Sequence, residues 1–431
     1  MILLDTALQK LDSEQRPLQI AIYGSGFMVR GIVNQIHKYT PGIRVALVVN
    51  RTVQNARDML DTVGVGELAD ITSVKSLEDS IANGQTGVTN DPLIALKSGA
   101  IDLIVESTGH VEYGAHVITQ AIEHGKPVVN MNAELDATVG PWINELASRA
   151  GVLVTGCDGD QPAVQMNLHR FVKQLGLTPR VCGNIKGLQD RYRNPTTQAG
   201  FAKEWGQSPT MVTSFADGTK ISFEQALVAN ATGMQVATRG MLGFEHDGHV
   251  DDMLDWYDLD QLRELGGIVD YVVGPKPGPG VYVFAEAPND YIQKHYLNYG
   301  KLGKGPLYSF YVPYHLTVME VALSIARVGL FQDHVVTSVG KPTVDVIATA
   351  KVNLAVGDLI DGLGGYKTYG LCENAGPAME MNALPMGIAE GCRMVRAVKK
   401  DTVLTYDDVE LPSDKLSIKL RQAQDKHFFE H

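Results

Sequence analysis

Near its N-terminus the chain reads Ile20-Ala-Ile-Tyr-Gly24-Ser-Gly26-Phe-Met-Val-Arg-Gly31. Its first residues predict a buried strand that ends in a glycine turn, and the run from Gly31 to Tyr39 predicts a helix. Gly24 allows the tight turn, and Gly26 lets the backbone approach a pyrophosphate that the free N–H groups of the helix attract. We therefore predict a dinucleotide-binding turn formed by Gly24, Ser25, Gly26, Phe27 and Met28.

The glycine pattern is incomplete, because Val29 stands where a third glycine is usual and Gly31 follows two residues later. The surrounding pattern supports it, since a second strand, Ile43–Val49, ends at the expected spacing. An acidic residue after that strand would bond a ribose 2′-hydroxyl, whereas a cation suits a 2′-phosphate. The residues found there predict NADP(H) rather than NAD(H), with a solvated arginine as the alternative: Asn50, Arg51 and Thr52.

Composition limits the classes of protein to which this chain can belong. It has 431 residues, of which 44% are hydrophobic and 20% charged, which is typical of a globular protein with two or three domains. The net charge of −12 argues against a general nucleic-acid binder. No apolar run approaches the roughly 20 residues of a membrane span, and the charged residues 1–16 do not form a signal peptide. We expect a cytoplasmic protein that binds neither nucleic acid nor membranes.

The four cysteines are Cys157, Cys182, Cys372 and Cys392, and their spacing matches no metal-binding pattern. Buried free thiols in a reducing compartment are the expected state. Cys157 follows a predicted strand, so a nucleophilic thiol there is the alternative.

Strand and helix signals alternate over the first 157 residues. This alternation predicts an α/β fold with a Rossmann-type, doubly wound parallel sheet covered by helices on both faces. Because such sheets bind ligands beyond the carboxyl ends of their strands, residues that follow later strands join the predicted cofactor site. They are Ser107, Thr108, Gly109, Asn132 and Gly159.

The pattern changes twice further along the chain. We predict an NADP-binding domain over residues 1–158, an α+β substrate domain over residues 159–335, and a small β-rich domain over residues 336–431. Nothing in the last segment gathers acids, bases and glycines, so we interpret it as a packing, oligomerisation or lid module. The chain length and this accessory module make a homo-oligomer, a dimer or a tetramer, the expected assembly.

Several short motifs carry a family resemblance that spans nearly the whole chain. They are Gly24-Ser-Gly26, Glu106-Ser-Thr-Gly109, Val128-Val-Asn-Met-Asn132, Gly156-Cys-Asp-Gly-Asp-Gln-Pro162, Asn184-Ile-Lys-Gly187, Ser214-Phe-Ala-Asp-Gly-Thr-Lys220 and Tyr314-His-Leu316. With them the chain resembles the homoserine dehydrogenase-like oxidoreductases that carry a C-terminal SAF (antifreeze-like) domain. The segment 387–409 resembles the SAF module.

The departures from that family favour one of its branches. Homoserine dehydrogenases place a lysine directly after the asparagine that Asn132 resembles, and this chain has Ala133 there. It carries Lys186-Gly187 where they have an asparagine before a glycine. The chain is therefore more similar to the deoxyxylulose-phosphate reductoisomerase-like branch. That likeness implies deoxyxylulose 5-phosphate as the substrate and a divalent metal, Mg or Mn, as a second cofactor.

Lys186 is the main candidate for the chemistry of a carbonyl reduction, which needs a proton donor and electrostatic stabilisation at the developing alkoxide. Its alternative is a surface lysine beside a glycine turn. Asp160 can orient a lysine, bond a hydroxyl group or help to hold a metal, or it can cap the helix that follows. Glu134 can supply a second carboxylate, or simply begin a helix.

Two further groups complete the predicted catalytic set. Asp190, Arg191 and Arg193 form a dense polar cluster after Lys186, which can grip a phosphate or carboxylate or lie in a solvated loop. Lys220 is the last residue of the turn predicted over residues 214–220, and it pairs by spacing with a glutamate four residues on. The resemblance implies that Lys220 contacts substrate. An acidic loop with two histidines, residues 245–252, is expected to be solvated rather than metal-binding.

Together these features predict an NADP-dependent oxidoreductase that acts on a small polar keto or hydroxy substrate. The nicotinamide would lie near Thr108, Asn132 and Gly159, with Asp160 and Lys220 holding substrate oxygens. A polyol or amino-alcohol dehydrogenase without isomerisation is one alternative. A regulatory protein that senses NADP(H) without turnover is the other.

Overall fold

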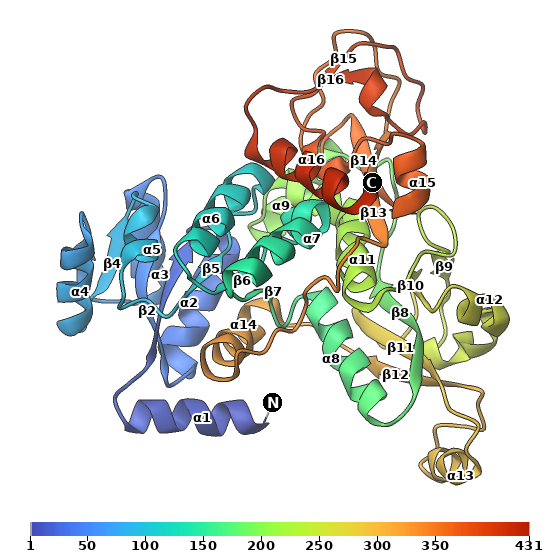
Figure 1. Cartoon of the computed structure of the whole chain (residues 1–431), viewed down its shortest axis with the longest axis horizontal. Coiled ribbons are helices and arrows are strands. Elements are labelled where there is room, and N and C mark those ends of the chain that lie inside the picture. Colours follow the sequence, from blue (N-terminus) through green and yellow to red (C-terminus); the bar gives the residue numbers. More distant parts are fainter. Residues whose placement is uncertain (1, 431) are drawn as a thin grey trace. The chain divides into compact units, whose positions relative to one another are not determined.

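The computed structural model describes residues 2–430, which form two compact units (Figure 1). Unit 1 runs to Asp160 and also takes in residues 316–337 and 419–424, and unit 2 takes in the rest of the described chain. The chain therefore leaves unit 1 after Asp160 and returns to it at Leu316. The division into three domains at residues 158 and 335 stays a prediction.

Unit 1 is built on a parallel sheet whose strands, within the described residues, follow the order β3-β4-β2-β1-β5-β6-β7. The strand order reverses at β1, which lies between β2 and β5, and sheets of this kind bind ligands at such a point. The predicted doubly wound parallel sheet is confirmed. Its strands are β1 (Leu18–Tyr23), β2 (Ile43–Val49), β3 (Leu68–Asp70), β4 (Thr86–Thr89), β5 (Leu103–Glu106), β6 (Val128–Asn130) and β7 (Val154–Gly156).

Helices flank this sheet because their apolar faces match the apolar strands. A hydrophobic core of unit 1 joins β1 to α2 and α14, through side chains such as Ile20, Val29, Ile32, Val321 and Ile325. The helices are α1 (Ile2–Ser13), α2 (Phe27–Tyr39), α3 (Val53–Val63), α4 (Val74–Ala82), α5 (Leu93–Lys97), α6 (Val111–Glu123), α7 (Ala133–Ala150) and α14 (Thr317–Ala326), which continues as the π-helical turn η2 (Arg327–Phe331). Helix α2 begins four residues before the predicted start, because Gly26 already occupies its N-cap.

Unit 2 contains a mixed sheet in the order β12-β11-β8-β10-β9, in which β8 is parallel to β10 and antiparallel to β11. Helix α11 is buried along almost its whole length, from Thr219 to Ala231. Elements up to residue 315 are α8 (Gln161–Gln174), β8 (Thr178–Lys186), α9 (Pro195–Trp205), α10 (Pro209–Ala216), α11 (Thr219–Thr232), β9 (Phe244–Glu245), η1 (Val250–Trp256), α12 (Leu259–Glu264), β10 (Ile268–Val273), β11 (Gly280–Glu286), α13 (Tyr291–Tyr299) and β12 (Leu307–Val312).

The C-terminal part of unit 2 holds two small antiparallel strand pairs, as the β-rich composition predicts. Its elements are β13 (Val344–Ala350), β14 (Thr368–Asn374), α15 (Ala375–Glu380), η3 (Met386–Ile388), β15 (Arg393–Met394), η4 (Tyr406–Asp408) and β16 (Val409–Glu410). The last helix, α16 (Leu416–Phe429), donates from Arg421 and Gln424 to the carbonyl oxygen of Thr138 in α7. None of the described helices is both long and apolar enough to span a bilayer.

Candidate active site

The glycine turn after β1 has the backbone that a dinucleotide site requires. Gly24 has a φ of +114°, and a Cβ there would lie 2.8 Å from the carbonyl oxygen of Ser107, so only glycine fits against the end of β5. Gly26 is the N-cap residue of α2, and a Cβ there would meet nothing within 4 Å. Open space in front of the first amides of α2 leaves room for a phosphate group.

The displaced third glycine has a packing explanation. Val29 is fully buried in the core of unit 1. A Cβ on Gly31 would lie 2.9 Å from the side chain of Val318, so the close approach occurs two residues later, between α2 and α14. In the usual pattern the third glycine lets the helix pack closely on the sheet. Here Gly31 instead lets α2 pack closely on the helix α14.

The end of β2 places Arg51 at the surface. Asn50 donates its Nδ2 hydrogen bond to the carbonyl oxygen of Thr52 at 2.8 Å, and Thr52 is the N-cap residue of α3. The tight turn between β2 and α3 thereby exposes Arg51 to solvent. The residue is available to a ligand at this edge of the sheet.

A buried carboxyl group organises the ends of β5 and β6. Glu106 is fully buried, and its Oε1 accepts hydrogen bonds from the backbone N–H of Thr108, at 2.9 Å, and from the Thr108 hydroxyl. Burial raises the pKa of Glu106 to about 7. Asn132, also buried, caps α7 by accepting from the N–H of Leu135 at 3.1 Å. Thr108 and Asn132 therefore have structural roles that fix the backbone at the predicted nicotinamide position.

The end of β7 is fastened to α14. Asp158 is fully buried, and it exchanges two hydrogen bonds with Ser324: its N–H donates to Oγ at 2.6 Å, and its Oδ2 accepts from that hydroxyl at 2.7 Å. Gly159 has a φ of +83°, and its carbonyl oxygen accepts from the Thr317 hydroxyl at 3.1 Å. Asp160 is half-buried and immediately precedes α8.

In unit 2, Lys186 ends β8 as a half-buried side chain. Its Nζ donates to Gln189 Oε1 at 2.8 Å and to the carbonyl oxygen of Phe215 at 2.9 Å. Burial lowers the pKa of Lys186 to about 8, and the charges of Glu224 and Asp217 partly oppose that shift. An ammonium group with this pKa can give up a proton near neutral pH.

Polar side chains from β8, α8 and α11 surround the same region of unit 2. Glu224 is buried and pairs with Lys220, whose Nζ lies 3.9 Å from its Oε1. Asn184 donates to Glu224 Oε2 at 3.4 Å and exchanges hydrogen bonds with Gln161 at 2.5 and 2.9 Å. The predicted residues Lys186 and Lys220 therefore both lie near the carboxylate of Glu224. The sequence predicted Glu224 only as the helical partner of Lys220.

The turn predicted over residues 214–220 is shorter than expected. Ser214 lies in α10, whereas Lys220 already belongs to α11, and only Asp217 and Gly218 connect the two helices. Gly218 has a φ of +90°, which allows the chain to reverse within two residues. As a consequence Lys220 and Glu224 lie on the same helix, one turn apart.

The predicted polar cluster after Lys186 has partners within unit 2. Arg193 Nε lies 3.0 Å from Asp190 Oδ2, and the N–H of Tyr192 donates to the other oxygen of Asp190 at 3.1 Å. The guanidinium of Arg191 lies over the ring of Tyr369, 5.7 Å from its centroid. Arg191 remains exposed, so its role as a phosphate ligand stays a prediction.

Two family models match adjoining parts of the chain. Residues 24–155 match the NAD-binding domain of homoserine dehydrogenase, and residues 159–321 match the catalytic domain of oxidoreductase DRL. Over these residues the chain is of the NAD(P)-dependent oxidoreductase type. The predicted resemblance is confirmed to that extent, and a nicotinamide cofactor is supported, whereas the SAF domain and the reductoisomerase-like branch stay predictions.

Solved structures similar to this oxidoreductase include a Klebsiella pneumoniae protein assigned as an oxidoreductase, with 18% identity over 40% of this chain and 44% of that one, at a TM-score of 0.26. The match therefore spans less than half of the Klebsiella protein. The Bacillus subtilis protein yvaA, also assigned as an oxidoreductase, has 10% identity over 74% and 91% of the two chains, at a TM-score of 0.38.

A third similar structure is KijD10, a 3-ketoreductase from Actinomadura kijaniata in complex with NADP, with 11% identity over 74% and 91% of the two chains, at a TM-score of 0.35. None of the curated proteins matches the chain significantly in sequence.

Among its described residues, the oxidoreductase has no group of three or more His, Cys, Asp or Glu side chains placed to hold a metal ion. All four cysteines are buried free thiols. In the acidic loop, His246 pairs with Asp252 at 3.1 Å, and His249 pairs with Asp251 at 3.2 Å. These contacts account for the density of charge in that loop.

Sequence reasoning missed the roles of three buried charged residues, Glu106 and Asp158 in unit 1 and Lys351 in unit 2. Glu106 begins the motif Glu106-Ser-Thr-Gly109, and Asp158 lies in the motif of residues 156–162. Their places at strand ends were the available signal. Lys351 gave no comparable signal, because its partner Asp217 lies 134 residues away in the sequence.

Proposed function

We propose that this oxidoreductase uses NADP(H) to interconvert a small polar keto substrate and its alcohol, with Lys186 as the acid and base. The observation that carries the proposal is the setting of Lys186, whose ammonium is held between Gln189 and the carbonyl of Phe215 while burial brings its pKa to about 8. A group that must protonate an alkoxide in one direction and accept its proton in the other works best with a pKa near the working pH.

The described residues of unit 1 fit a phosphorylated dinucleotide. Gly26 leaves open space at the start of α2, where a pyrophosphate would meet backbone amides. Arg51 is exposed after β2, where a 2′-phosphate would need a cation. When bound, the nicotinamide supplies or accepts a hydride. Unit 1 would orient that cofactor by the rigid backbone around Thr108, which Glu106 holds.

The residues of unit 2 would bind substrate and move the proton. Lys186 would donate to the developing alkoxide, and Glu224 and Asp217 would keep enough negative charge nearby for the lysine to regain its proton. Lys220, paired with Glu224, would hold a second substrate oxygen. The amides of Asn184 and Gln161 would keep the Glu224 carboxylate in place.

The substrate class follows from the charges that remain for a ligand. Lys186, Lys220 and Lys351 carry three positive charges against the two carboxylates of Glu224 and Asp217. The net charge around Lys186 and Lys220 is therefore positive, which favours a substrate with an anionic or strongly polar group. By resemblance this would be deoxyxylulose 5-phosphate, with Arg191 and Arg193 near the phosphate and Asp160 on a hydroxyl. We assign no residue to a divalent metal, because the described residues offer no group of three suitable ligands.

The decisive experiment mixes the protein with NADPH or NADH and a panel of keto-sugar phosphates, unphosphorylated ketoses and 2-keto acids, and follows absorbance at the nicotinamide band. A light-scattering measurement of the same sample tests the expected dimer or tetramer. Reduction without rearrangement would indicate a plain dehydrogenase. Tight NADPH binding with no turnover of any substrate would indicate a sensor and contradict the proposal.

Replacement of Lys186 by Ala should lower kcat by about 10²–10⁴-fold, as expected for loss of a general acid. The NADPH dissociation constant should stay within about twofold. The rate of carbonyl reduction in the native enzyme should fall as the pH rises through about 8, because the ammonium form is the proton donor and that form is lost above its pKa. Loss of NADPH binding with turnover intact would contradict the assigned role.

A further inference from the structure

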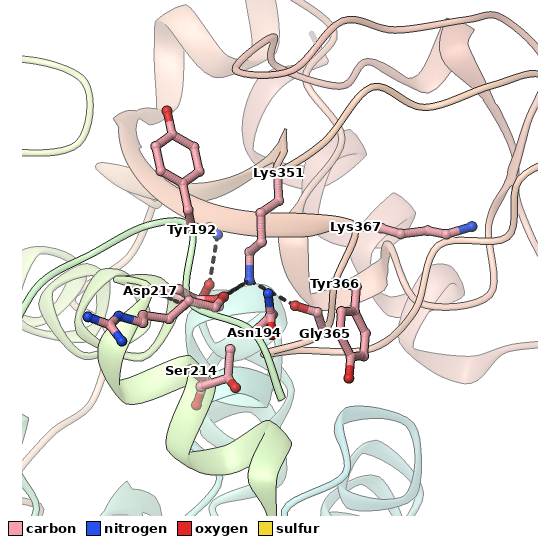
Figure 2. Close-up of polar contacts among 12 residues, drawn as sticks. Tyr192, Asn194, Ser214, Asp217, Lys351, Gly365, Tyr366 and Lys367 are labelled. Carbon is pink, nitrogen blue, oxygen red and sulfur yellow. Dashed lines mark hydrogen bonds and ion pairs between the residues drawn. The ribbon is translucent and has the colours of Figure 1, made fainter. Parts of the chain in front are cut away.

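Lys351 is a buried lysine at the end of β13, in the segment that the sequence suggested was only an accessory module. Its side chain is 3% exposed. The Nζ atom donates to three oxygen atoms, each at 2.8 Å: the carbonyl oxygens of Arg193 and Gly365 and Oδ2 of Asp217. Figure 2 shows this ammonium group at the centre of the cluster, with Asp217 and Gly365 on its two sides. All three of its N–H donors are therefore used.

The acceptors of Lys351 lie on the segments that shape the candidate site. Arg193 ends the loop that begins after Lys186. Asp217 stands two residues after Phe215, whose carbonyl oxygen accepts from Lys186, and three residues before Lys220. The same two segments also meet directly, since the N–H of Asp190 donates to the carbonyl oxygen of Ala216 at 2.7 Å.

The third acceptor fixes the C-terminal end of this arrangement. Gly365 lies in the loop before β14, which Asp361 stabilises by accepting hydrogen bonds from the N–H groups of Tyr366 and Lys367. The hydroxyl of Tyr366 lies 2.9 Å from that of Thr196 in α9. One ammonium group thus joins the loop after β8, the α10–α11 junction and the loop before β14.

The contact between Lys351 and Asp217 also balances charge. The Asp217 side chain is fully buried, and its other carboxylate oxygen accepts from the N–H of Thr219 at 2.9 Å. Without Lys351 this buried carboxylate would keep no counter-charge among the contacts described for it. The negative charge of Asp217 would then act on Lys186 without the opposing charge of Lys351.

We propose that Lys351 is a positioning residue for the reaction: it holds the Lys186 loop and the start of α11 in register and neutralises Asp217 beside them. The catalytic half of this inference rests on the proposed function of Lys186. The charged groups described near Lys186 include three pairs, namely Glu224 with Lys220, Asp217 with Lys351 and Asp190 with Arg193, and also Arg191, which lies over the ring of Tyr369.

The test compares the full-length native enzyme with Lys351→Met, with Lys351→Met combined with Asp217→Asn, and with a matched control, Lys367→Met. Lys367 lies in the same part of unit 2, but its Nζ bonds only the surface-accessible Asp358 at 3.1 Å among the contacts described for it. Two readouts are taken: kcat, and the titration midpoint of Lys186 followed by NMR of its carbon-13-methylated amine. The second readout needs no substrate.

In Lys351→Met, kcat should fall by about tenfold to 100-fold, as expected when reacting groups are misplaced by about 1 Å. The Lys186 midpoint should move to higher pH, because Asp217 has lost its counter-charge, and it should return towards the native value in the double variant. Lys367→Met should leave both readouts unchanged. Because the substitutions lie in unit 2, thermal unfolding of the whole chain followed by near-ultraviolet circular dichroism reports whether each variant is folded.

Two outcomes would overturn the inference: a folded Lys351→Met enzyme with native kcat and midpoint, or a loss of kcat without any shift of the midpoint, which marks a merely structural residue. If Lys351→Met does not fold, Lys351→Arg decides: it keeps the charge, so the midpoint should not move, but its planar fork cannot meet all three acceptors, and native kcat would contradict positioning. If the native enzyme turns over no substrate, the proposed function fails, and the midpoint alone tests the action of Lys351 on Lys186.

Discussion

Burial shifts the pKa values of Lys186 and Glu106 in opposite directions. Burial disfavours the charged form of each side chain, so it lowers the pKa of the lysine to about 8 and raises that of the carboxyl group to about 7. Both groups then change protonation close to neutral pH. Lys186 donates a hydrogen bond to the carbonyl oxygen of Phe215, whereas Glu106 accepts one from the backbone N–H of Thr108.

Arg51 carries the expected choice between the two nicotinamide cofactors. Replacement of Arg51 by Asp should shift the ratio of NADPH to NADH affinity towards NADH by about 10- to 100-fold, because one charge-assisted hydrogen bond contributes about 1.5–3 kcal/mol. Isothermal titration with each cofactor measures the ratio. Arg16→Asp, at another exposed site in unit 1, is the control and should leave the ratio unchanged. An unaltered NADPH preference in the Arg51 variant would show that other residues select the cofactor.

At the scale of elements, the contact of α2 with α14 explains the unusual glycine spacing. Gly31 lets the two helices approach, and any side chain there would collide with Val318. Gly31→Ala should therefore destabilise the protein by about 1–3 kcal/mol, the usual cost of overpacking. Urea unfolding measures the change. Gly66→Ala is a matched control in the same unit, where an added Cβ meets nothing, and it should change stability by less than about 0.5 kcal/mol. Equal effects of the two substitutions would contradict this account.

The elements that sequence patterns predicted share one property: they are local. The strand Ile20–Tyr23 and its glycine turn could be recognised because apolar runs and turn residues lie next to each other in the chain. The early start of α11 was missed, because the reversal at Gly218 depends on a backbone angle rather than on hydrophobic periodicity. The three hydrogen bonds of Lys351 could not be predicted, because its acceptors on Arg193, Asp217 and Gly365 are brought together only by the fold.

At the scale of the whole molecule, unit 1 depends on residues 316–337, which follow it in the sequence only after residues 161–315 of unit 2. Residues 316–337 supply α14, whose Val321 and Ile325 are fully buried in the core of unit 1, and Ser324, which bonds Asp158. The β7 strand also uses this segment, because Thr155 accepts hydrogen bonds from the N–H groups of Val335 and Val336 at 3.0 and 3.2 Å.

A fragment of residues 1–160 should therefore lack cooperative unfolding, whereas the same fragment joined by a flexible linker to residues 316–337 should regain it. Thermal unfolding followed by near-ultraviolet circular dichroism distinguishes them. A linked fragment with Val321 and Ile325 changed to Asp is the control and should behave like residues 1–160 alone. Cooperative melting of the unlinked fragment at the temperature of the linked one would refute this dependence.

The return of α14 to unit 1 has a consequence for how the protein is made. Synthesis at about 5–20 residues per second separates the emergence of residue 160 from that of residue 337 by roughly 10–35 s. During that interval the apolar face of α2 that later meets α14 is uncovered on the nascent chain. Apolar surface that is exposed in this way makes a nascent chain prone to aggregation, so we expect shielding by chaperones to raise the yield of folded protein.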